Sequence, residues 1–131
     1  MTLGADGLRG FPAKDKTASP YGTGGRIIFV SATLHYAGVP LQLHAAAAKA
    51  GVDAVSATVC IEEGPRGITS NVIAPGAIAA TEGMARLSPG GASWKRVPSG
   101  RAGYAREIAD ATVFLLSEAG NYVNGAVVVG T

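Results

Sequence analysis

The stretch from Ser31 to Gly76, with the strand before it, constrains the fold more than any other part of the chain. A short apolar run, Arg26 to Val30, precedes this stretch, and a second run, Ile68 to Ile73, leads into Pro75-Gly76. Short runs rich in β-branched residues are typical of strands buried on both faces of a parallel sheet. A long alanine-rich segment joins the two runs, so the sequence predicts a β–α–β unit and an α/β fold.

The remaining elements are expected to extend this unit in the order strand, helix, strand, helix, strand. Parallel strands joined by helices normally form right-handed crossovers, so we expect both connections to be right-handed. Residues 1–25 predict a loop or disordered lead-in, and residues 26–131 one partial Rossmann-like domain. Within this domain we expect a loop at His35 to Pro40, a helix at about Leu41 to Glu63, a helical turn at Thr81 to Leu87, a loop at Ser88 to Ser93, a helix at Ala105 to Glu118 and a strand at Ala126 to Val129.

The predicted helix from Leu41 to Glu63 is apolar on nearly all sides. One stripe recurs at the helical spacing of three and four residues, and the opposite side carries small alanines. A helix that is apolar all round is normally covered all round. We therefore expect a helix of a second subunit on the alanine side, and a homo-oligomer. The stripe consists of Leu41, Ala45, Ala48, Val52, Val55 and Val59, and the alanine side of Ala46, Ala47, Ala50, Ala54 and Ala57.

The composition argues against several classes of function. The chain has 131 residues, a net charge of +2 and no basic run interleaved with aromatic residues, so no nucleic-acid partner is expected. It contains no apolar run long enough for a membrane span and no spacing of acidic residues typical of a metal site. The one cysteine, Cys60, falls in an apolar helical pattern and is expected to be an inert thiol.

Motifs spread from Gly24 to Val129 resemble the C-terminal half of the short-chain dehydrogenase/reductases. The segment from Asn71 to Thr81 is similar to the family's Asn-Val-x-x-Pro-Gly-x-Ile-x-x-Thr. The runs Phe29 to Tyr36 and Ile73 to Met84 most resemble the fungal peroxisomal 2,4-dienoyl-CoA reductases. The resemblance implies an incomplete Rossmann-like parallel sheet, about three strands with flanking helices, in which the N-terminal half of the fold is missing. The other matching motifs are Lys49-Ala50-Gly51-Val52-Asp53-Ala54, Gly64-Pro65-Arg66-Gly67-Ile68, Arg101, Glu107-Ile108-Ala109, Phe114-Leu115 and Tyr122-Val123-Asn124-Gly125.

The sequence departs from the superfamily at two catalytic positions. Most members place a tyrosine four residues before the lysine, where the ammonium lowers the pKa of the phenol, and this chain has Ala45 there. The serine that polarises a substrate carbonyl corresponds to Ala32, with Ser31 one position away. A ketone reductase would lack its acid and its oxyanion donor. A dienoyl-CoA reductase tolerates both losses better, because hydride goes to the far end of a conjugated diene and the charge spreads onto the thioester oxygen.

The resemblance also implies the site residues. Lys49 is the expected catalytic residue, which hydrogen-bonds the nicotinamide ribose and lends positive potential to the anionic intermediate; a solvent-facing helix lysine is the alternative. Ser31 and His44 are candidates for substrate binding. His44 lies about 140° around the helix from Lys49, so a structural or surface histidine is its alternative role. The residues that resemble the family's nicotinamide-binding loop, where an ordinary strand-to-helix turn is the alternative, are Pro75, Gly76, Ile78 and Thr81.

The implied function is that of an NADPH-dependent 2,4-dienoyl-CoA reductase of unsaturated fatty acid β-oxidation, with an acyl-CoA substrate and a peroxisomal location. The chain is expected to be a fragment, since no glycine-rich phosphate-binding turn is visible in residues 1–25. The chain ends in Val129-Gly130-Thr131 and not in a Ser-Lys-Leu address, so a cytoplasmic location is the alternative. Two other interpretations stay open: a catalytically inactive truncated homologue, and an interaction module that uses the alanine-rich helix.

Overall fold

The fold is built on a three-stranded parallel sheet. The computed structural model describes residues 24–87 and 97–131; the predicted lead-in before residue 24 and the predicted loop at Ser88 to Ser93 lie outside the described residues. The strands are β1 (Arg26–Val30), β2 (Thr69–Pro75) and β3 (Val127–Gly130), and they lie side by side in the order β1-β2-β3. The register pairs Val30 with Ile73 and Ile73 with Val128. The predicted parallel α/β architecture is confirmed.

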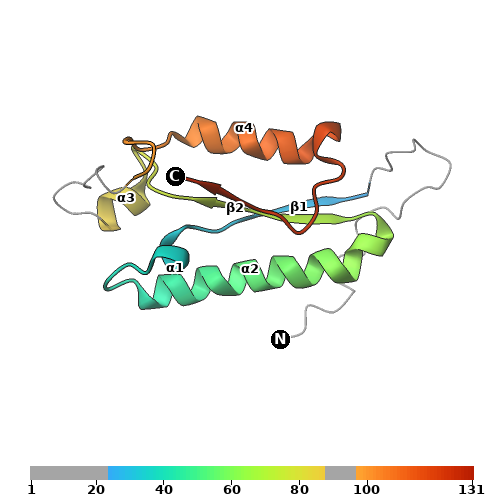
Figure 1. The fold of residues 1–131 in the computed structure, drawn as a ribbon, viewed down its shortest axis with the longest axis horizontal. Helices are drawn as coiled ribbons and strands as arrows, with labels where there is room; N and C mark the ends of the chain where they lie inside the picture. Colours follow the sequence, from blue (N-terminus) through green and yellow to red (C-terminus); the bar gives the residue numbers. More distant parts are fainter. Residues whose placement is uncertain (1–23, 88–96) are drawn as a thin grey trace.

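Two helices cover the two faces of this sheet. α2 (Leu43–Glu63) lies on one face and α4 (Ala105–Leu116) on the other, which gives three layers (Figure 1). The central strand β2 therefore supplies most of the core. The fully buried apolar residues among those described are Ile68, Val72, Ile73, Ala74 and Leu115.

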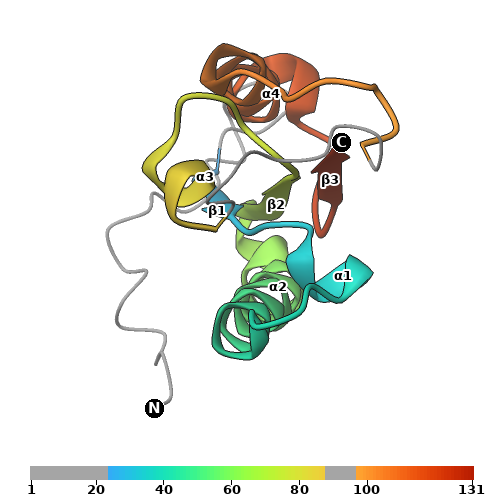
Figure 2. The same ribbon diagram turned by 90° about the vertical axis from the view of Figure 1, so that its left-hand side faces the viewer.

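The two connections between the strands have opposite hands. In Figure 2 the strands point toward the reader and run from β1 through β2 to β3, with α2 below the sheet and α4 above it. The β1–α2–β2 connection is consequently right-handed, as predicted, whereas the β2–α4–β3 connection is left-handed. The expectation of two right-handed crossovers is wrong for the second, because a right-handed connection would have placed α4 on the same face as α2.

α2 packs on the sheet through part of the predicted stripe, since Ala45, Val52 and Val59 are half-buried, and through polar residues outside that stripe. Its buried residues are Ser56 and Glu63, whereas Ala48 and Val55 of the predicted stripe are exposed and Leu41, two residues before the helix, is 94% exposed. The buried polar side chains are satisfied: the Ser56 hydroxyl hydrogen-bonds that of Ser70 at 2.9 Å, and Glu63 accepts from Arg66 at 2.5 Å. The packed face thus runs through polar residues that an apolar pattern cannot detect.

The alanine side of α2 is exposed in the described chain. Ala47, Ala50, Ala54 and Ala57 are exposed, Ala46 is half-buried, and Ile61 near the end of the same helix is 77% exposed. This agrees with a helix face that the described residues leave largely uncovered. The oligomer itself remains a prediction.

Short elements shape the edge of the sheet where the strands end. The segment after β1 forms a one-turn helix, α1 (Leu34–Ala37), so the loop predicted at His35 to Pro40 is wrong for its first three residues. α3 (Glu82–Leu87) follows β2 and matches the predicted helical turn. Two 3₁₀ turns lie among the described residues, η2 (Gly64–Arg66) and η4 (Glu118–Gly120).

Asn71 guides the chain from η4 into β3. Its side-chain amide donates to the carbonyl of Val123 at 2.8 Å, and its side-chain oxygen accepts from the N–H of Ala126 at 2.9 Å. Asn71 is fully buried, so both of its polar groups need such partners. These bonds fix the start of β3 beside the first half of β2.

Candidate functional site

A cavity of about 650 Å³ opens at the carboxyl ends of β1 and β2. Ligands of open α/β sheets bind outside the carboxyl ends of the parallel strands, and the cavity has this position. One wall comes from the end of β1 with α1, and the other from the segment between β2 and α3, with the start of α4. The lining residues that the sequence singled out for a ligand are Ser31, Pro75, Gly76, Ile78 and Thr81.

Lys49 lies behind this cavity and does not line it. Its Nζ donates a hydrogen bond to the carbonyl oxygen of Val30, the last residue of β1, at 2.8 Å. The backbone N–H of the next residue, Ser31, donates to Ile73 of β2. Because backbone groups of successive residues in a strand point to opposite edges, the Val30 carbonyl points to the outer edge of β1. An ammonium has three donors, so this bond leaves two of them for other acceptors.

Ser31 is buried and its hydroxyl is occupied. The hydroxyl donates to the backbone carbonyl of Lys49 at 3.3 Å, and only 4% of the residue is exposed. Ala32 also lines the cavity but carries no donor. The hydroxyl of this candidate for substrate binding is thus turned toward α2.

His44 is exposed near the start of α2 and does not line either described cavity. The structure therefore separates His44 from the other candidate residues. Its predicted role in substrate binding stays a prediction.

Gly76 makes its close backbone contact with the end of β3. Its N–H donates to the carbonyl of Gly130 at 2.6 Å, and a Cβ at this position would lie 2.9 Å from the same oxygen. The neighbouring carbonyl of Pro75 accepts from the N–H of Thr33 at 3.1 Å. The close approach predicted for Gly76 exists, but between the ends of β2 and β3.

Thr81 caps the short helix α3. Its hydroxyl donates to the carbonyl of Ile78 at 2.9 Å and accepts from the N–H of Met84 at 3.2 Å. A hydroxyl has a single proton to donate, so the donor expected for a ligand is already used. Thr81 shapes the wall of the cavity through α3.

Gln42 is a lining residue that the sequence did not single out. Its side-chain oxygen is buried and has no hydrogen-bond partner among the described residues. A buried polar atom without a partner costs free energy that a bound donor group would recover. A carboxamide oxygen accepts hydrogen bonds, so the site fits a ligand with an amide N–H, such as the carboxamide of a nicotinamide or an amide of coenzyme A. The residues present thus fit the nicotinamide end of the implied cofactor.

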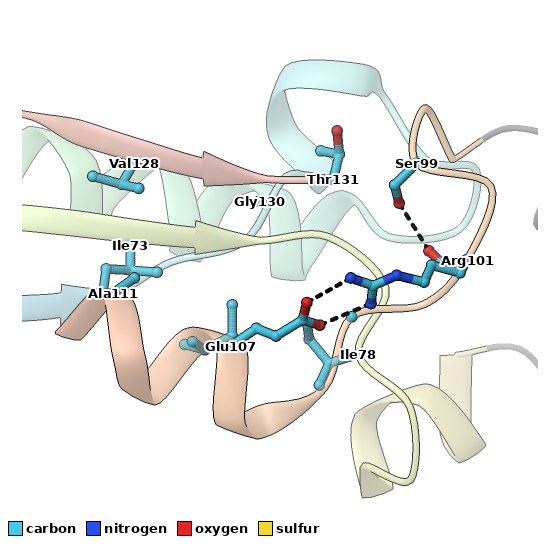
Figure 3. Close-up of a pocket in the computed structure, with 11 residues that line it drawn as sticks. Ile73, Ile78, Ser99, Arg101, Glu107, Ala111, Val128, Gly130 and Thr131 are labelled. Atoms are coloured by element: carbon cyan, nitrogen blue, oxygen red, sulfur yellow. Dashed lines mark hydrogen bonds and ion pairs between the residues drawn. The ribbon is translucent and has the colours of Figure 1, made fainter. Parts of the chain in front are cut away.

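A second, smaller cavity of about 200 Å³ lies between the ends of β2 and β3 and the start of α4. Figure 3 shows Arg101 and Glu107 at its mouth, with both nitrogens of the guanidinium directed at the carboxylate. The two bonds measure 2.8 and 2.5 Å, and Glu107 also accepts from the N–H of Tyr104 at 2.8 Å. These bonds from Arg101 and Tyr104 hold the pKa of Glu107 at about 2.

The sequence located Glu107 at the start of its helix but did not pair it with Arg101. The spacing from Tyr104 predicts that Glu107 lies at the helix start. An acidic residue at the third helical position that accepts from the backbone of the N-cap residue forms half of a capping box. The six-residue separation between Arg101 and Glu107 spans the turn into α4, so helical periodicity cannot reveal that pair.

The described residues contain no group of three His, Cys, Asp or Glu side chains placed to hold a metal ion. Across the same ranges, 24–87 and 97–131, none of the helices has both the length and the apolar character needed to cross a membrane.

Comparisons with known proteins identify the family of this chain. A sequence model of the family described as enoyl-(acyl carrier protein) reductase matches residues 8–130. The peroxisomal 2,4-dienoyl-CoA reductase of Saccharomyces cerevisiae is 51% identical over 110 residues, which cover 80% of this chain and 37% of the relative. The corresponding protein of Danio rerio is 44% identical over 110 residues, again 37% of its length.

A solved structure of similar fold is a short chain dehydrogenase from Bacillus anthracis. It matches with a TM-score of 0.69 and 39% identity over 81% of this chain and 42% of that one. This chain thus spans less than half the length of the relatives it matches. It belongs to the short-chain dehydrogenase/reductase superfamily, and within it is similar to the fungal 2,4-dienoyl-CoA reductases.

Proposed function

We propose that this chain carries the nicotinamide-facing part of an NADPH-dependent 2,4-dienoyl-CoA reductase that acts on unsaturated acyl-CoA thioesters in peroxisomal β-oxidation. The observation that supports it most directly is the large cavity, which gathers Ser31, Gly76 and Thr81 at the carboxyl ends of two parallel strands. The printed names of the similar proteins supply the reaction.

Each wall of the cavity has a separate task in this proposal. When bound, the reduced nicotinamide supplies a hydride. The segment from Pro75 to Thr81 forms the surface on which its ring lies, and Gln42 accepts a hydrogen bond from an amide. The apolar side chains of Leu34 and Val39 exclude water from the opposite wall.

Lys49 is proposed to hold the nicotinamide ribose with the donors that Val30 leaves free. Its position behind β1 brings the positive charge close to the cavity without placing it inside. Such a charge stabilises negative charge that develops on the thioester oxygen. Ala32 and Ala45 supply no acid, so the proton that completes the reaction comes from another group, through a water that an acid holds.

The test is a reductase assay on the purified chain with 2,4-hexadienoyl-CoA and NADPH. We expect loss of the reduced-nicotinamide absorbance, and we expect Lys49→Met to slow it by about 10²-fold. Arg106→Met is the matched control, because Arg106 is an exposed cation on α4 that lines neither described cavity. An absence of both turnover and NADPH binding in the unmodified chain would contradict the proposal.

A second proposal concerns partners. The exposed alanine side of α2, with the exposed Val55 and Ile61, favours self-association through this helix or pairing with a longer relative. Sedimentation of Ala54→Glu beside the parent tests it, since a glutamate on this face disfavours a close helix pair. A parent that stays monomeric at micromolar concentration would contradict it. A chain without activity that still melts cooperatively would favour the inactive homologue.

A further inference from the structure

A polar cluster joins α1 to α2 behind the wall of the large cavity. The Asp53 carboxylate accepts a hydrogen bond from Nε2 of His35 at 2.7 Å and another from the Tyr36 hydroxyl. The side chains of His35 and Asp53 are only 10% and 17% exposed. The His35 and Tyr36 rings also contact each other, with centroids 3.8 Å apart. We call these three residues the Asp53 clasp.

The protonation states of the clasp follow from its contacts. Burial would raise the pKa of Asp53, but hydrogen bonds from neighbouring side chains, among them those of Tyr36 and His35, outweigh it and lower the pKa. The carboxylate is therefore ionised and can only accept, so Nε2 of His35 carries a proton. Burial, together with the nearby Asp53, raises the pKa of Tyr36 to about 12, which keeps the phenol a donor at neutral pH.

α1 depends on contacts from outside for its position. It contains only four residues, none of them buried, and Thr33 makes no side-chain cap. A helix of one turn is not stable by itself in water. The chain then leaves α1 through Gly38 at φ 67°, so no continuing helix supports it. α1 lies alongside α2 in both views (Figures 1 and 2).

The two sides of α1 face different surroundings. Leu34 and Ala37, three residues apart and thus on one side of the turn, line the cavity. His35 and Tyr36 reach Asp53 instead. A rotation of α1 about its axis would exchange these sides and present polar rings to the cavity.

We propose that Asp53 is a positioning residue: by holding His35 and Tyr36, it fixes the rotation of α1 and so presents Leu34 and Ala37 as the apolar wall that contacts the acyl chain of the substrate. The identity of that substrate rests on the proposed function, whereas the hold on α1 does not.

Hydrogen exchange tests the hold on α1 without any ligand. The amides of Tyr36, Ala37 and Gly38 bond to carbonyls at the start of α1, so their exchange reports its opening. We expect Asp53→Asn to speed their exchange by about tenfold or more, and to leave the amides of β2 unchanged. Asp110→Asn is the matched control, since Asp110 lies exposed on α4 and, among the described residues, pairs with Arg106 alone, at 3.7 Å. Unchanged exchange in α1 would overturn the proposal.

Two ligand titrations separate positioning from general stability. We expect Asp53→Asn to weaken binding of 2,4-hexadienoyl-CoA by about fivefold or more, while NADPH affinity changes by less than about twofold, because the nicotinamide wall lies on the other side of the cavity. Equal weakening of both would assign Asp53 a purely structural role and overturn the positioning claim.

A third outcome distinguishes the two proposals. If the parent chain binds neither probe, the proposed function fails, and hydrogen exchange still decides whether Asp53 holds α1. If Asp53→Asn does not fold, Tyr36→Phe serves instead, because it removes one bond of the clasp and keeps the carboxylate. We expect Tyr36→Phe to speed exchange in α1 and to weaken binding of 2,4-hexadienoyl-CoA, both by less than Asp53→Asn. If neither changes, the proposal is overturned.

Discussion

The two cavities at the carboxyl edge of the sheet share Ile78 and Ile108 but differ in what their polar groups do. In the small cavity the charges are saturated, since Glu107 accepts from Arg101 and from the Tyr104 N–H. In the large cavity the oxygen of Gln42 has no partner among the described residues. The ion pair of the small cavity thus stabilises the turn into α4, whereas the large, mostly apolar cavity keeps the Gln42 oxygen as a hydrogen-bond acceptor for a ligand.

The largest effect is expected where the cavities meet, at the bond from Gly76 to Gly130. Gly76→Ala places a Cβ 2.9 Å from the Gly130 oxygen, so the ends of β2 and β3 must separate. Crowding of this kind costs about 1–3 kcal/mol in the free energy of unfolding, which denaturant titration measures.

Gly83→Ala is the matched control for this change. Nothing lies within 4 Å of a Cβ at Gly83, which is inside α3. Alanine is the better helix former, so this variant should be neutral or more stable by up to about 1 kcal/mol. Equal losses in both variants would show that the contact at Gly76 has no special weight.

The pH dependence of stability tests the role of the Glu107 carboxylate in the small cavity. The pKa of Glu107 is about 2 in the folded chain against an ordinary 4.5, so the carboxylate contributes stability above about pH 4.5 that is lost as the pH falls toward 2. Glu107→Gln should lower the melting temperature at pH 6 and reduce its fall between pH 4.5 and 2.

Glu82→Gln provides the comparison for the acid titration, because Glu82 is in an exposed pair with Arg86 on α3. Such exposed pairs contribute little, so this variant should keep the pH profile of the parent. A profile for Glu107→Gln that is parallel to the parent's would contradict the assigned role of the ion pair.

The smallest effect concerns the loop that borders the large cavity. Ala80 adopts φ 56°, a left-handed conformation that a side chain disfavours. Ala80→Gly should therefore raise the free energy of unfolding by less than about 1 kcal/mol, which thermal denaturation can detect. A lower stability would mean that the methyl group makes a contact that outweighs the strain.

Much of the fold could be predicted from the sequence because its strands are short apolar runs between clear breaks. The ends of β2 and of α2 lie within two residues of their predicted places. The face of α2 was harder, since Ser56 packs through a hydroxyl pair with Ser70, a long-range partner that hydrophobic spacing cannot reveal. The left-handed connection through α4 was missed because the handedness depends on which face of the sheet α4 covers, and α2 already covers the other face.

The location of the candidate site could be predicted from the sequence better than the hydrogen bonds of its residues. Carboxyl ends of parallel strands meet at one edge, and Ser31 and Gly76, which follow two neighbouring strands, line the same cavity. The directions of their polar groups depend on neighbours far apart in sequence. Thus the Ser31 hydroxyl points to Lys49, and the ammonium of Lys49 to Val30. For the same reason the sequence did not reveal the Asp53 clasp.

The carboxamide of Asn71 has a consequence for how this chain can vary. Its N–H donor and its oxygen acceptor make the hydrogen bonds that a backbone peptide group would make, and both partners are backbone groups, of Val123 and Ala126. Many side chains at those two positions could satisfy the same bonds, whereas a substitute at position 71 would need the same length and the same donor and acceptor. A library randomised at all three positions should therefore recover asparagine at one and a broad alphabet at the other two.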